Sequence, residues 1–168
     1  MVSIRPLQEG DEPVIEEFLN KLSRKSLRLR YFSVAVDLQK AATWAAEITS
    51  DRYSLLAYYE GELVAHAVYI KTDDEHAEVA VEVLDHFQQH GIATVLIEKL
   101  AEVAETRGVR YFQAVVLPDN RLMLAVFKDG FGARAFFKDG DEMIEFPTSS
   151  WRAAQDLIAS NFHGPVEG

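Results

Sequence analysis

The segment from residue 77 to residue 100 constrains the fold more than any other part of the chain, because its apolar periodicity changes within a few residues. Between residues 77 and 84 apolar and polar side chains alternate, as they do in a half-buried strand. From residue 92 to residue 103 apolar side chains recur three and four positions apart, as they do on one face of a helix. The polar turn Gln-Gln-His-Gly at residues 88–91 joins the two. The segment therefore predicts a strand, a tight turn and a long amphipathic helix.

The turn is suited to a phosphate group. Backbone N–H groups in the first turn of a helix have no partner within the helix, and the helix dipole is positive at that end. Gly91 allows close approach of the backbone to a ligand, and Ala93 is small for the same reason. The chain contains neither Gly-x-x-x-x-Gly-Lys-Ser/Thr nor Gly-x-Gly-x-x-Gly. Two interpretations stay open: a pyrophosphate site of another kind, in which His90 is the one potentially cationic side chain, or an ordinary strand-to-helix turn.

The composition is that of one globular domain. With 168 residues, of which 48% are apolar, the chain is long enough to bury a full core, and we expect residues 1–168 to form a single domain. No apolar run approaches the roughly 18 residues of a membrane span, and the N-terminus lacks the blocks of a signal peptide. The absence of cysteine excludes disulfides and thiolate metal sites. We expect a cytoplasmic protein with no membrane partner and no metal site.

The charge of the chain limits its partners. A net charge of −10 disfavours nucleic acid, because binding to its phosphates requires an excess of Lys and Arg. Acidity would steer cationic acceptors toward the surface, although a gain in solubility is the simpler explanation. An anionic ligand would then depend on backbone amides and on a few local cations.

The rest of the chain shows helical and strand patterns in turn. A strand is expected at residues 2–5, and Asp11, Ser23 and Asp37 are candidate N-caps of three helices. The later elements are expected in this order: strands at 53–59, 63–70 and 77–84, a helix from 91 to 107 ended by Gly108, a strand at 111–117, a short helix from 118 to 130, strands at 133–137 and 142–146, and a helix at 150–162. The three central strands predict an antiparallel meander, because short turns join them.

Several features of the sequence resemble the GNAT acetyltransferase superfamily. Gln88, Gly91 and Ala93 occupy the defining places of its acyl-CoA motif, Gln/Arg-x-x-Gly-x-Gly/Ala. The opening Ile-Arg-Pro at residues 4–6, and Asn120 with the Gly-Phe that follows it ten residues later, are similar to two further landmarks of that family.

The resemblance implies an α/β fold, the GNAT acyl-CoA N-acyltransferase fold. This fold has a mixed, mostly antiparallel sheet with helices on both faces. The implied core spans about residues 2–147, and a C-terminal helical extension follows at about residues 148–162.

A narrower resemblance, through residues 22–32 and the Ala-Glu-Val-Ala-Val of residues 77–81, is to bacterial protein lysine acetyltransferases of the Pat type. It implies an N-acetyltransferase that moves an acetyl group from acetyl-CoA, its cosubstrate, to a primary amine, with a protein lysine as the acceptor. Backbone groups near Val83 and Leu84 would pair with pantetheine, and an amide near Val83 would face the acyl oxygen. The implied cofactor-binding residues are Val83, Leu84, Gln88, Gln89, His90, Gly91, Ile92, Ala93, Thr94, Asn120 and Phe127.

Two glutamates are candidate catalytic residues. A lysine amine has a pKa of about 10.4, so roughly 0.1% or less is neutral at pH 7, and a nearby carboxylate can take its proton. Glu78 matches the glutamate that serves as general base in the Pat-type proteins, and Glu82 is the reserve. The two share a strand face at a separation of roughly 13 Å, too far for a coupled pair. The alternative is that both are solvated on an exposed face of the sheet.

One position departs from the family pattern. Many GNAT enzymes have a tyrosine that protonates the CoA thiolate where this chain has Phe127, so water or another residue such as Tyr31 would serve here. We expect residues 24–32 to lie over the acceptor site, although solvated arginines around a buried aromatic residue would explain them as well. Asn120 has the alternative role of helix cap. His66 is expected to be a packing residue.

Two other functions stay open. The same chemistry could serve a small-molecule amine, because acceptor selection lies in loops and in the N-terminal helices. A non-catalytic acyl-CoA-binding or interaction module would keep the fold without turnover. A homodimer is compatible with either function.

Overall fold

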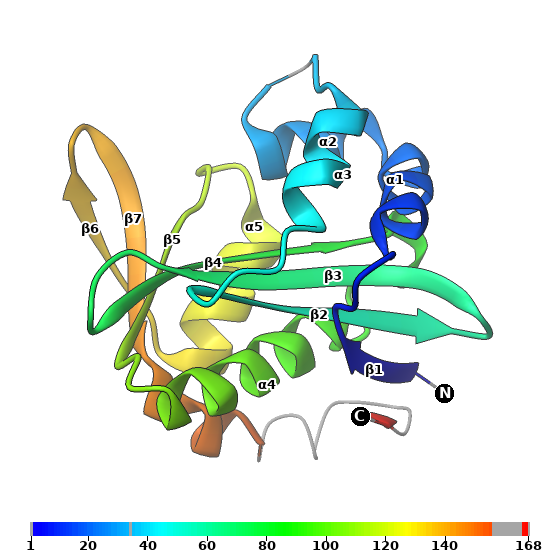
Figure 1. The fold of residues 1–168 in the computed structure, drawn as a ribbon. Helices are drawn as coiled ribbons and strands as arrows, with labels where there is room; N and C mark the ends of the chain where they lie inside the picture. The colour runs from blue at the N-terminus through cyan, green and yellow to red at the C-terminus, as the bar shows by residue number, and fades with distance from the viewer. Residues whose placement is uncertain (1, 34, 156–165, 168) are drawn as a thin grey trace.

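The computed structural model describes residues 2–33, 35–155 and 166–167. Its strands form one twisted sheet with helices on both faces (Figure 1). The strands are β1 (Val2–Pro6), β2 (Arg52–Tyr59), β3 (Glu62–Lys71), β4 (His76–Val83), β5 (Tyr111–Val115), β6 (Arg134–Lys138), β7 (Asp141–Pro147) and β8 (Val166–Glu167). Across the described part of the sheet their order is β6-β7-β5-β4-β3-β2-β1-β8.

Most strand pairs in this sheet are antiparallel. β1 pairs with β2, β2 with β3 and β3 with β4 in this way, which confirms the predicted meander. β7 pairs antiparallel with both β5 and β6. The pairs β4–β5 and β1–β8 are parallel. The mixed, mostly antiparallel sheet expected from the sequence is therefore confirmed.

The helices divide between the two faces of the sheet. α1 (Glu12–Lys21), α2 (Arg24–Tyr31) and α3 (Leu38–Ala45) lie on one face, and α4 (Ile92–Thr106) lies on the other (Figure 1). The shorter elements are the 3-10 turn η1 (Asp85–Phe87), helix α5 (Arg121–Ala125), the π turn η2 (Val126–Gly130) and the 3-10 turn η3 (Thr148–Ser150). Residues 151–155 are helical. The remainder of the helix expected at 150–162 lies outside the described residues.

Local capping explains where several helices begin and end. The side chains of Ser23 and Asp37 accept hydrogen bonds from the backbone N–H groups of α2 and α3, as predicted. Gly108 follows α4 with φ at +82°, a conformation that glycine adopts without strain. Asp11 is the N-cap residue of α1, as predicted, but its side chain accepts no hydrogen bond from the helix. Its carboxylate instead accepts bonds of 2.8 and 2.9 Å from the guanidinium of Arg5, which competes for the same oxygens.

The apolar core fills the space between the sheet and the helices on both sides. On one face α1 buries Ile15, Phe18 and Leu19, and on the other face α4 buries residues that include Leu96 and Leu100. Full burial of such a side chain contributes about 1.5–3 kcal/mol. These amphipathic faces hold the helices against the sheet.

The two central strands β4 and β5 separate partway along their length. Their register pairs His76–Glu78 with Tyr111–Gln113 and extends no further. Beyond Glu78 the strands therefore splay apart. This gap between two neighbouring strands positions the candidate site.

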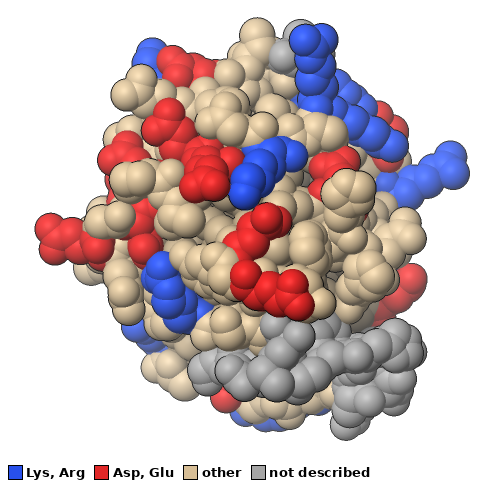
Figure 2. Space-filling view, turned by 90° about the vertical axis from the view of Figure 1, so that its right-hand side faces the viewer, with Lys and Arg blue, Asp and Glu red and all other residues tan. Residues whose placement is uncertain are grey.

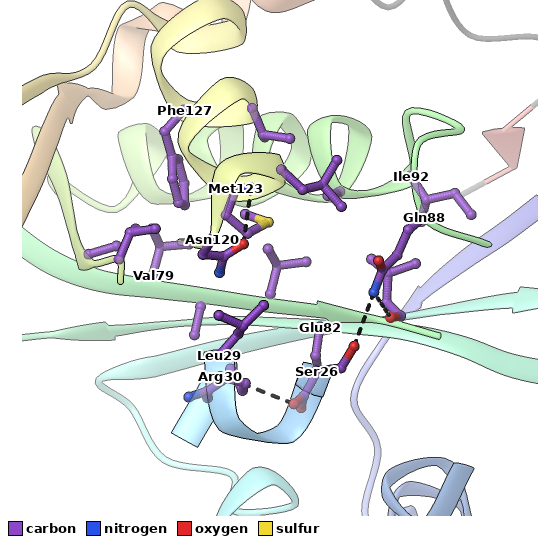
Figure 3. Close-up of a pocket in the computed structure, with 18 of the residues that line it drawn as sticks. Ser26, Leu29, Arg30, Val79, Glu82, Gln88, Ile92, Asn120, Met123 and Phe127 are labelled. Carbon is purple, nitrogen blue, oxygen red and sulfur yellow. Dashed lines mark hydrogen bonds and ion pairs between the residues drawn. The ribbon is translucent and has the colours of Figure 1, made fainter. Parts of the chain in front are cut away.

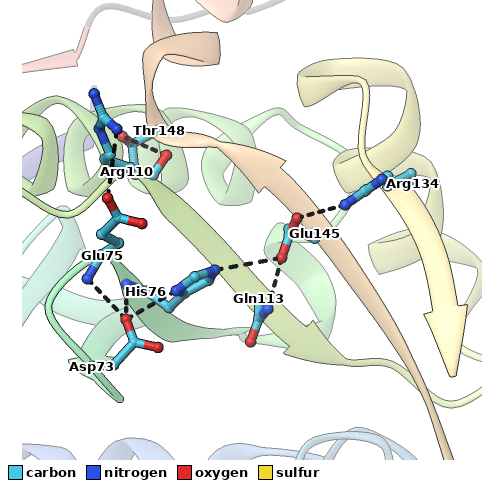
Figure 4. Close-up of polar contacts among 8 residues, drawn as sticks. All are labelled: Asp73, Glu75, His76, Arg110, Gln113, Arg134, Glu145 and Thr148. Carbon is cyan, nitrogen blue, oxygen red and sulfur yellow. Dashed lines mark hydrogen bonds and ion pairs between the residues drawn. The ribbon is translucent and has the colours of Figure 1, made fainter. Parts of the chain in front are cut away.

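Polar side chains fix the paired end of these strands (Figure 4). Gln113 Nε2 on β5 donates a hydrogen bond of 2.7 Å to Glu145 Oε2 on β7. His76 lies with Nδ1 2.9 Å from Asp73 Oδ1 and with Nε2 3.9 Å from Glu145 Oε2. Its ring also stacks on Tyr111 of β5, with 5.3 Å between centroids. These contacts hold the start of β4 against its neighbours, so that the separation is confined to the far end.

Charged side chains of both signs lie on the surface. Figure 2 shows one face, on which acidic side chains are spread widely and basic side chains gather toward the upper right of the view. The electrostatic potential at a given site therefore depends on the charged groups close to that site. In the described part of the chain no helix is long and apolar enough to cross a membrane.

Candidate functional site

A cavity of about 670 Å³ occupies the splay between β4 and β5. Its walls come from the second half of β4, from β5, from α2, from the segment 88–94 and from α5 with η2 (Figure 3). Of the residues predicted to bind a cofactor, the structure brings these to the cavity: Val83, Gln88, Gln89, Gly91, Ile92, Ala93, Thr94, Asn120 and Phe127. Leu84 and His90 do not line it.

The loop before α4 presents a free helix N-terminus to the cavity. Gly91 is the N-cap residue, with φ at +86°, and Gln89 also has a positive φ of +65°. The first bond within the helix runs from the Val95 N–H to the Gly91 carbonyl, so the N–H groups of residues 92–94 have no partner in the helix. The first turn contains no acidic residue. The positive end of the helix dipole is therefore not neutralised locally and favours an anion.

Gln88 closes this loop onto the strand that precedes it. Its Nε2 donates a bond of 3.0 Å to the Val83 carbonyl and lies 3.4 Å from Ser26 Oγ on α2 (Figure 3). The amide of Leu84 donates to the Val64 carbonyl at 2.9 Å, so it is directed at β3. Because N–H groups alternate in direction along a strand, the Val83 amide is directed at the splay.

The opposite wall of the cavity comes from α5 and η2. The Asn120 side chain accepts a bond of 3.3 Å from the Met123 N–H, which makes Asn120 the N-cap of α5. Phe127 is 2% exposed and packs on Phe146 with 5.6 Å between ring centroids. Among the described residues no tyrosine lines the cavity. The hydroxyl of Tyr31 is directed instead at Glu82 Oε1, 3.5 Å away.

Glu78 and Glu82 both line the cavity from β4, but their surroundings differ. Glu78 is exposed, and its side chain makes no hydrogen bond or ion pair with any described residue. Glu82 is 5% exposed, and its Oε1 lies 3.0 Å from His66 Nδ1 on β3. A carboxylate only accepts hydrogen bonds, so this His66 nitrogen carries the proton. The alternative that Glu82 is solvated on an exposed face is therefore wrong.

The surroundings of Glu82 keep it charged. Burial by itself raises the pKa of this carboxyl, but the hydrogen bond from His66 and the positive charge of Arg30 outweigh it, and the resulting pKa lies below its ordinary value. Burial also raises the pKa of the Tyr31 hydroxyl, which stays protonated. At neutral pH the site thus contains one buried, paired carboxylate and one exposed, unpaired carboxylate.

Comparison with known proteins identifies the family. The sequence profile of the acetyltransferase (GNAT) family matches residues 17–137. The chain belongs to the GNAT acetyltransferase family. Over 132 aligned residues it is 30% identical to an acetyltransferase of Pseudomonas aeruginosa. The aligned region covers 73% of this chain and 69% of the relative. This confirms the GNAT fold and the assignment as an N-acetyltransferase.

Solved GNAT structures agree with this assignment. The crystal structure of the GNAT domain of S. lividans PAT is 32% identical and superposes with a TM-score of 0.76, covering 86% of this chain and 89% of that domain. The predicted likeness to Pat-type proteins is therefore confirmed. Spermidine N-acetyltransferase from Vibrio cholerae, solved with CoA and spermine, has a TM-score of 0.68 over 90% of this chain and 98% of its own, but at 16% identity it shows the fold alone.

Some residues of this GNAT site were missed by the sequence analysis. His66 was expected to be a packing residue, and it is buried, but it also bonds to Glu82. The bond follows from the register of β3 against β4, which places His66 directly opposite Glu82. This register cannot be read from the sequence of either strand alone. Trp44 on α3, which the sequence analysis did not single out, also lines the cavity. The expectation that residues 24–32 lie beside the site agrees with the position of α2, from which Ser26, Leu29 and Arg30 line the cavity.

Proposed function

We propose that this protein transfers the acetyl group of acetyl-CoA to the side-chain amine of a protein lysine, by direct attack with Glu78 as the general base. The observation that carries the proposal is the cavity in the splay, which has the free N-terminus of α4 at one side and the unpaired carboxylate of Glu78 at another. A group transfer needs this arrangement, because donor and acceptor must meet in one space.

The donor half of the cavity fits acetyl-CoA, which supplies an activated thioester. The amides of Gly91, Ile92, Ala93 and Thr94 would hold its phosphates, with Gln89 at the loop. The Val83 amide, directed at the splay, is the proposed hydrogen-bond donor to the acyl oxygen. Asn120 and Phe127 would form the opposite wall. No tyrosine in the described part of the chain lines the cavity there, so we propose that water protonates the thiolate.

Glu78 suits the role of base better than Glu82. The carboxylate of Glu78 is exposed and unpaired, so it is free to accept a proton from the incoming ammonium group, directly or through water. Glu82 is already bonded to His66, and its pKa lies below the ordinary value. A carboxylate held in its charged form by fixed partners is a weak proton acceptor.

The acceptor half of the cavity has an apolar lining that suits the aliphatic stem of a lysine. The lining residues on this side are Leu29, Phe32, Trp44, Val68, Ile70 and Ala80. By register Ile70 lies directly opposite Glu78, so an amine at the end of an apolar stem would meet the carboxylate. The likeness to the GNAT domain of S. lividans PAT supports the same class of acceptor.

The test is acetylation of lysine-containing proteins and peptides, measured by mass spectrometry and by release of free CoA. We expect turnover in the wild type and a loss of about 10²–10⁴-fold in kcat in Glu78→Gln, with little change in acetyl-CoA affinity. Glu102→Gln, at an exposed position of α4, is the matched control and should behave as the wild type.

Other results of the same assay would contradict the proposal. Turnover with small amines such as spermidine, but not with any lysine peptide, would show that the acceptor is a small amine and not a protein lysine. Binding of acetyl-CoA without turnover on any amine would support a non-catalytic module. A fully active Glu78→Gln would remove Glu78 as the base.

A further inference from the structure

Helix α2 is held in place by polar contacts in addition to the half-buried Leu27 and Tyr31, which pack against the core. None of its eight residues is buried. At its N-terminal end Ser23 and Ser26 donate hydrogen bonds of 2.8 and 3.0 Å to the carboxylate of Asp85, which follows β4. In its middle Arg28 pairs with Asp119, on the far side of the splay. The helix therefore bridges the two separated strands, and its position depends on carboxylates of the structure beneath it.

The anchor at the C-terminal end of α2 is Glu82. Its Oε2 lies 3.8 Å from Arg30 Nε, and both of these atoms are buried without a hydrogen-bond partner among the described residues. Figure 3 shows Arg30 extending from α2 beside Glu82 at the edge of the cavity. His66 holds the other oxygen of Glu82. The carboxylate is thus fixed from the sheet side and directed at the helix.

Arg30 also links α2 to α3 through the ring of Trp44, and Arg52 links the same ring to β2. The Arg30 guanidinium lies over the ring of Tyr31 at 4.7 Å and near the ring of Trp44 at 5.5 Å. On β2 the guanidinium of Arg52 lies over the same Trp44 ring at 4.5 Å. The attraction between a guanidinium and an aromatic ring is stronger where the contact is shielded from water. Trp44 and Arg30 line the acceptor half of the cavity, so the anchor at Glu82 acts on its walls.

A buried charge is a costly way to stabilise a fold. Removing ions from water costs several kcal/mol for each ion, and apolar side chains of similar volume often give equal stability. A carboxylate whose own position is fixed does restrict the position of its partner, because α2 must place Arg30 beside Glu82 to pair with it. The charge at Glu82 is therefore better explained by the geometry that it imposes than by stability.

We infer that Glu82 is a positioning residue for the acceptor: together with His66 it seats Arg30 and Tyr31 of α2 and so sets the shape of the acceptor half of the cavity. This inference rests on the proposed function, in which that half receives the amine. It separates the roles of the two glutamates of β4. Glu78 accepts the proton, and Glu82 sets how well the amine binds.

The test compares Glu82→Gln and Arg30→Met with Arg24→Met. Arg24 is an exposed residue of the same helix whose side chain makes no ion pair or hydrogen bond with the described residues, so it is a matched control. Four quantities are measured: kcat and KM for a lysine peptide, the affinity for acetyl-CoA, and amide hydrogen exchange of residues 24–31 in the free protein. For both test variants we expect KM to rise about tenfold, equivalent to about 1.4 kcal/mol. Their kcat should stay within about threefold and their acetyl-CoA affinity should not change, while exchange in α2 becomes about tenfold faster.

Each contrary result has a separate meaning. A loss of kcat at unchanged KM in Glu82→Gln would make Glu82 the base and overturn the inference. Wild-type KM and exchange in both variants would also overturn it. Arg30→Met breaks the same link while keeping the buried Glu82–His66 pair, so it decides the matter if Glu82→Gln does not fold. Exchange is measured without substrates, so it reports on the anchor even if no amine is acetylated, a result that would overturn the proposed function instead.

Discussion

The side-chain amide of Gln88 donates a hydrogen bond of 3.0 Å to the carbonyl oxygen of Val83, which closes the loop before α4 onto the end of β4. The same nitrogen lies 3.4 Å from Ser26 Oγ on α2. Gln88 therefore connects three elements that surround the cavity. Its side chain organises the loop rather than extending toward a ligand.

Replacement of Gln88 should weaken acetyl-CoA binding through this loss of order. In Gln88→Met, which keeps the length of the side chain, we expect the dissociation constant for acetyl-CoA to rise about five- to tenfold, because a neutral hydrogen bond contributes about 0.5–1.5 kcal/mol. Isothermal titration calorimetry measures this. Gln39→Met changes an exposed glutamine of α3 that does not line the cavity, and is the control. Equal affinities of Gln88→Met and the wild type would show that the bond does not order the loop.

Charge at Gly91 should abolish cofactor binding. Acetyl-CoA at about 100 times its dissociation constant should raise the melting temperature of the wild type by roughly 5–10 °C, since such binding stabilises by about 2.7 kcal/mol. In Gly91→Glu we expect no rise, because the carboxylate would lie at the helix N-terminus and repel phosphates.

The control for Gly91→Glu is Gly61→Glu in the β2–β3 turn. Gly61 has φ at +80°, close to the +86° of Gly91, so both variants suffer similar backbone strain. Gly61→Glu should melt at a lower temperature but keep the full rise with acetyl-CoA. A rise that persists in Gly91→Glu would place the phosphates elsewhere.

A hydroxyl at position 127 should change catalysis little. Phe127 lines the cavity at 2% exposure, so Phe127→Tyr places a phenol near the donor half. Thiols have a pKa of about 8.5, so a thiolate leaves readily at neutral pH without an acid. We expect kcat, measured from pH 6 to pH 9, to stay within about threefold of the wild type. An increase of tenfold or more would show that protonation of the thiolate limits the reaction.

The ion pair between Arg5 and Asp11 should make stability depend on pH in the acid range. The hydrogen bonds from Arg5 lower the pKa of the Asp11 carboxyl below its value of 3.8 in the unfolded chain. A lowered pKa gives stability that is fully present above about pH 4 and is lost as the pH falls through the folded-state pKa. Asp11→Asn should therefore melt a few degrees below the wild type at pH 7, and the difference should shrink as the pH falls through the folded-state pKa of Asp11. Asp74→Asn, an exposed turn residue, is the control for thermal melting across the pH range. A constant difference at all pH values would assign the effect to packing.

Much of the fold could be predicted because its determinants are local. The helix expected at 91–107 is observed at Ile92–Thr106, and the caps Ser23 and Asp37 are where the sequence places them. Asp11 shows the limit of such reasoning. An aspartate before a helix is a typical cap, but here a guanidinium from β1 takes its oxygens.

Prediction of the candidate site was less complete for a similar reason. The loop at 88–93 was found from the sequence, because spacing alone carries its pattern. The contact between Gln88 and Ser26 and the bond between His66 and Glu82 were not found, because each joins groups that are distant along the chain.

The amino-acid sequence by itself determined most of the elements, their order, the turn proposed to bind an anion and the family, since periodicity, capping and spacing are properties of neighbouring residues. Only the tertiary structure distinguished the surroundings of the two glutamates of β4. Glu78 and Glu82 share one face of a strand, within the similar local sequences Ala-Glu-Val and Val-Glu-Val. Glu82 is buried and Glu78 is not, because strand register places His66 beside Glu82 and packing brings α2 over it.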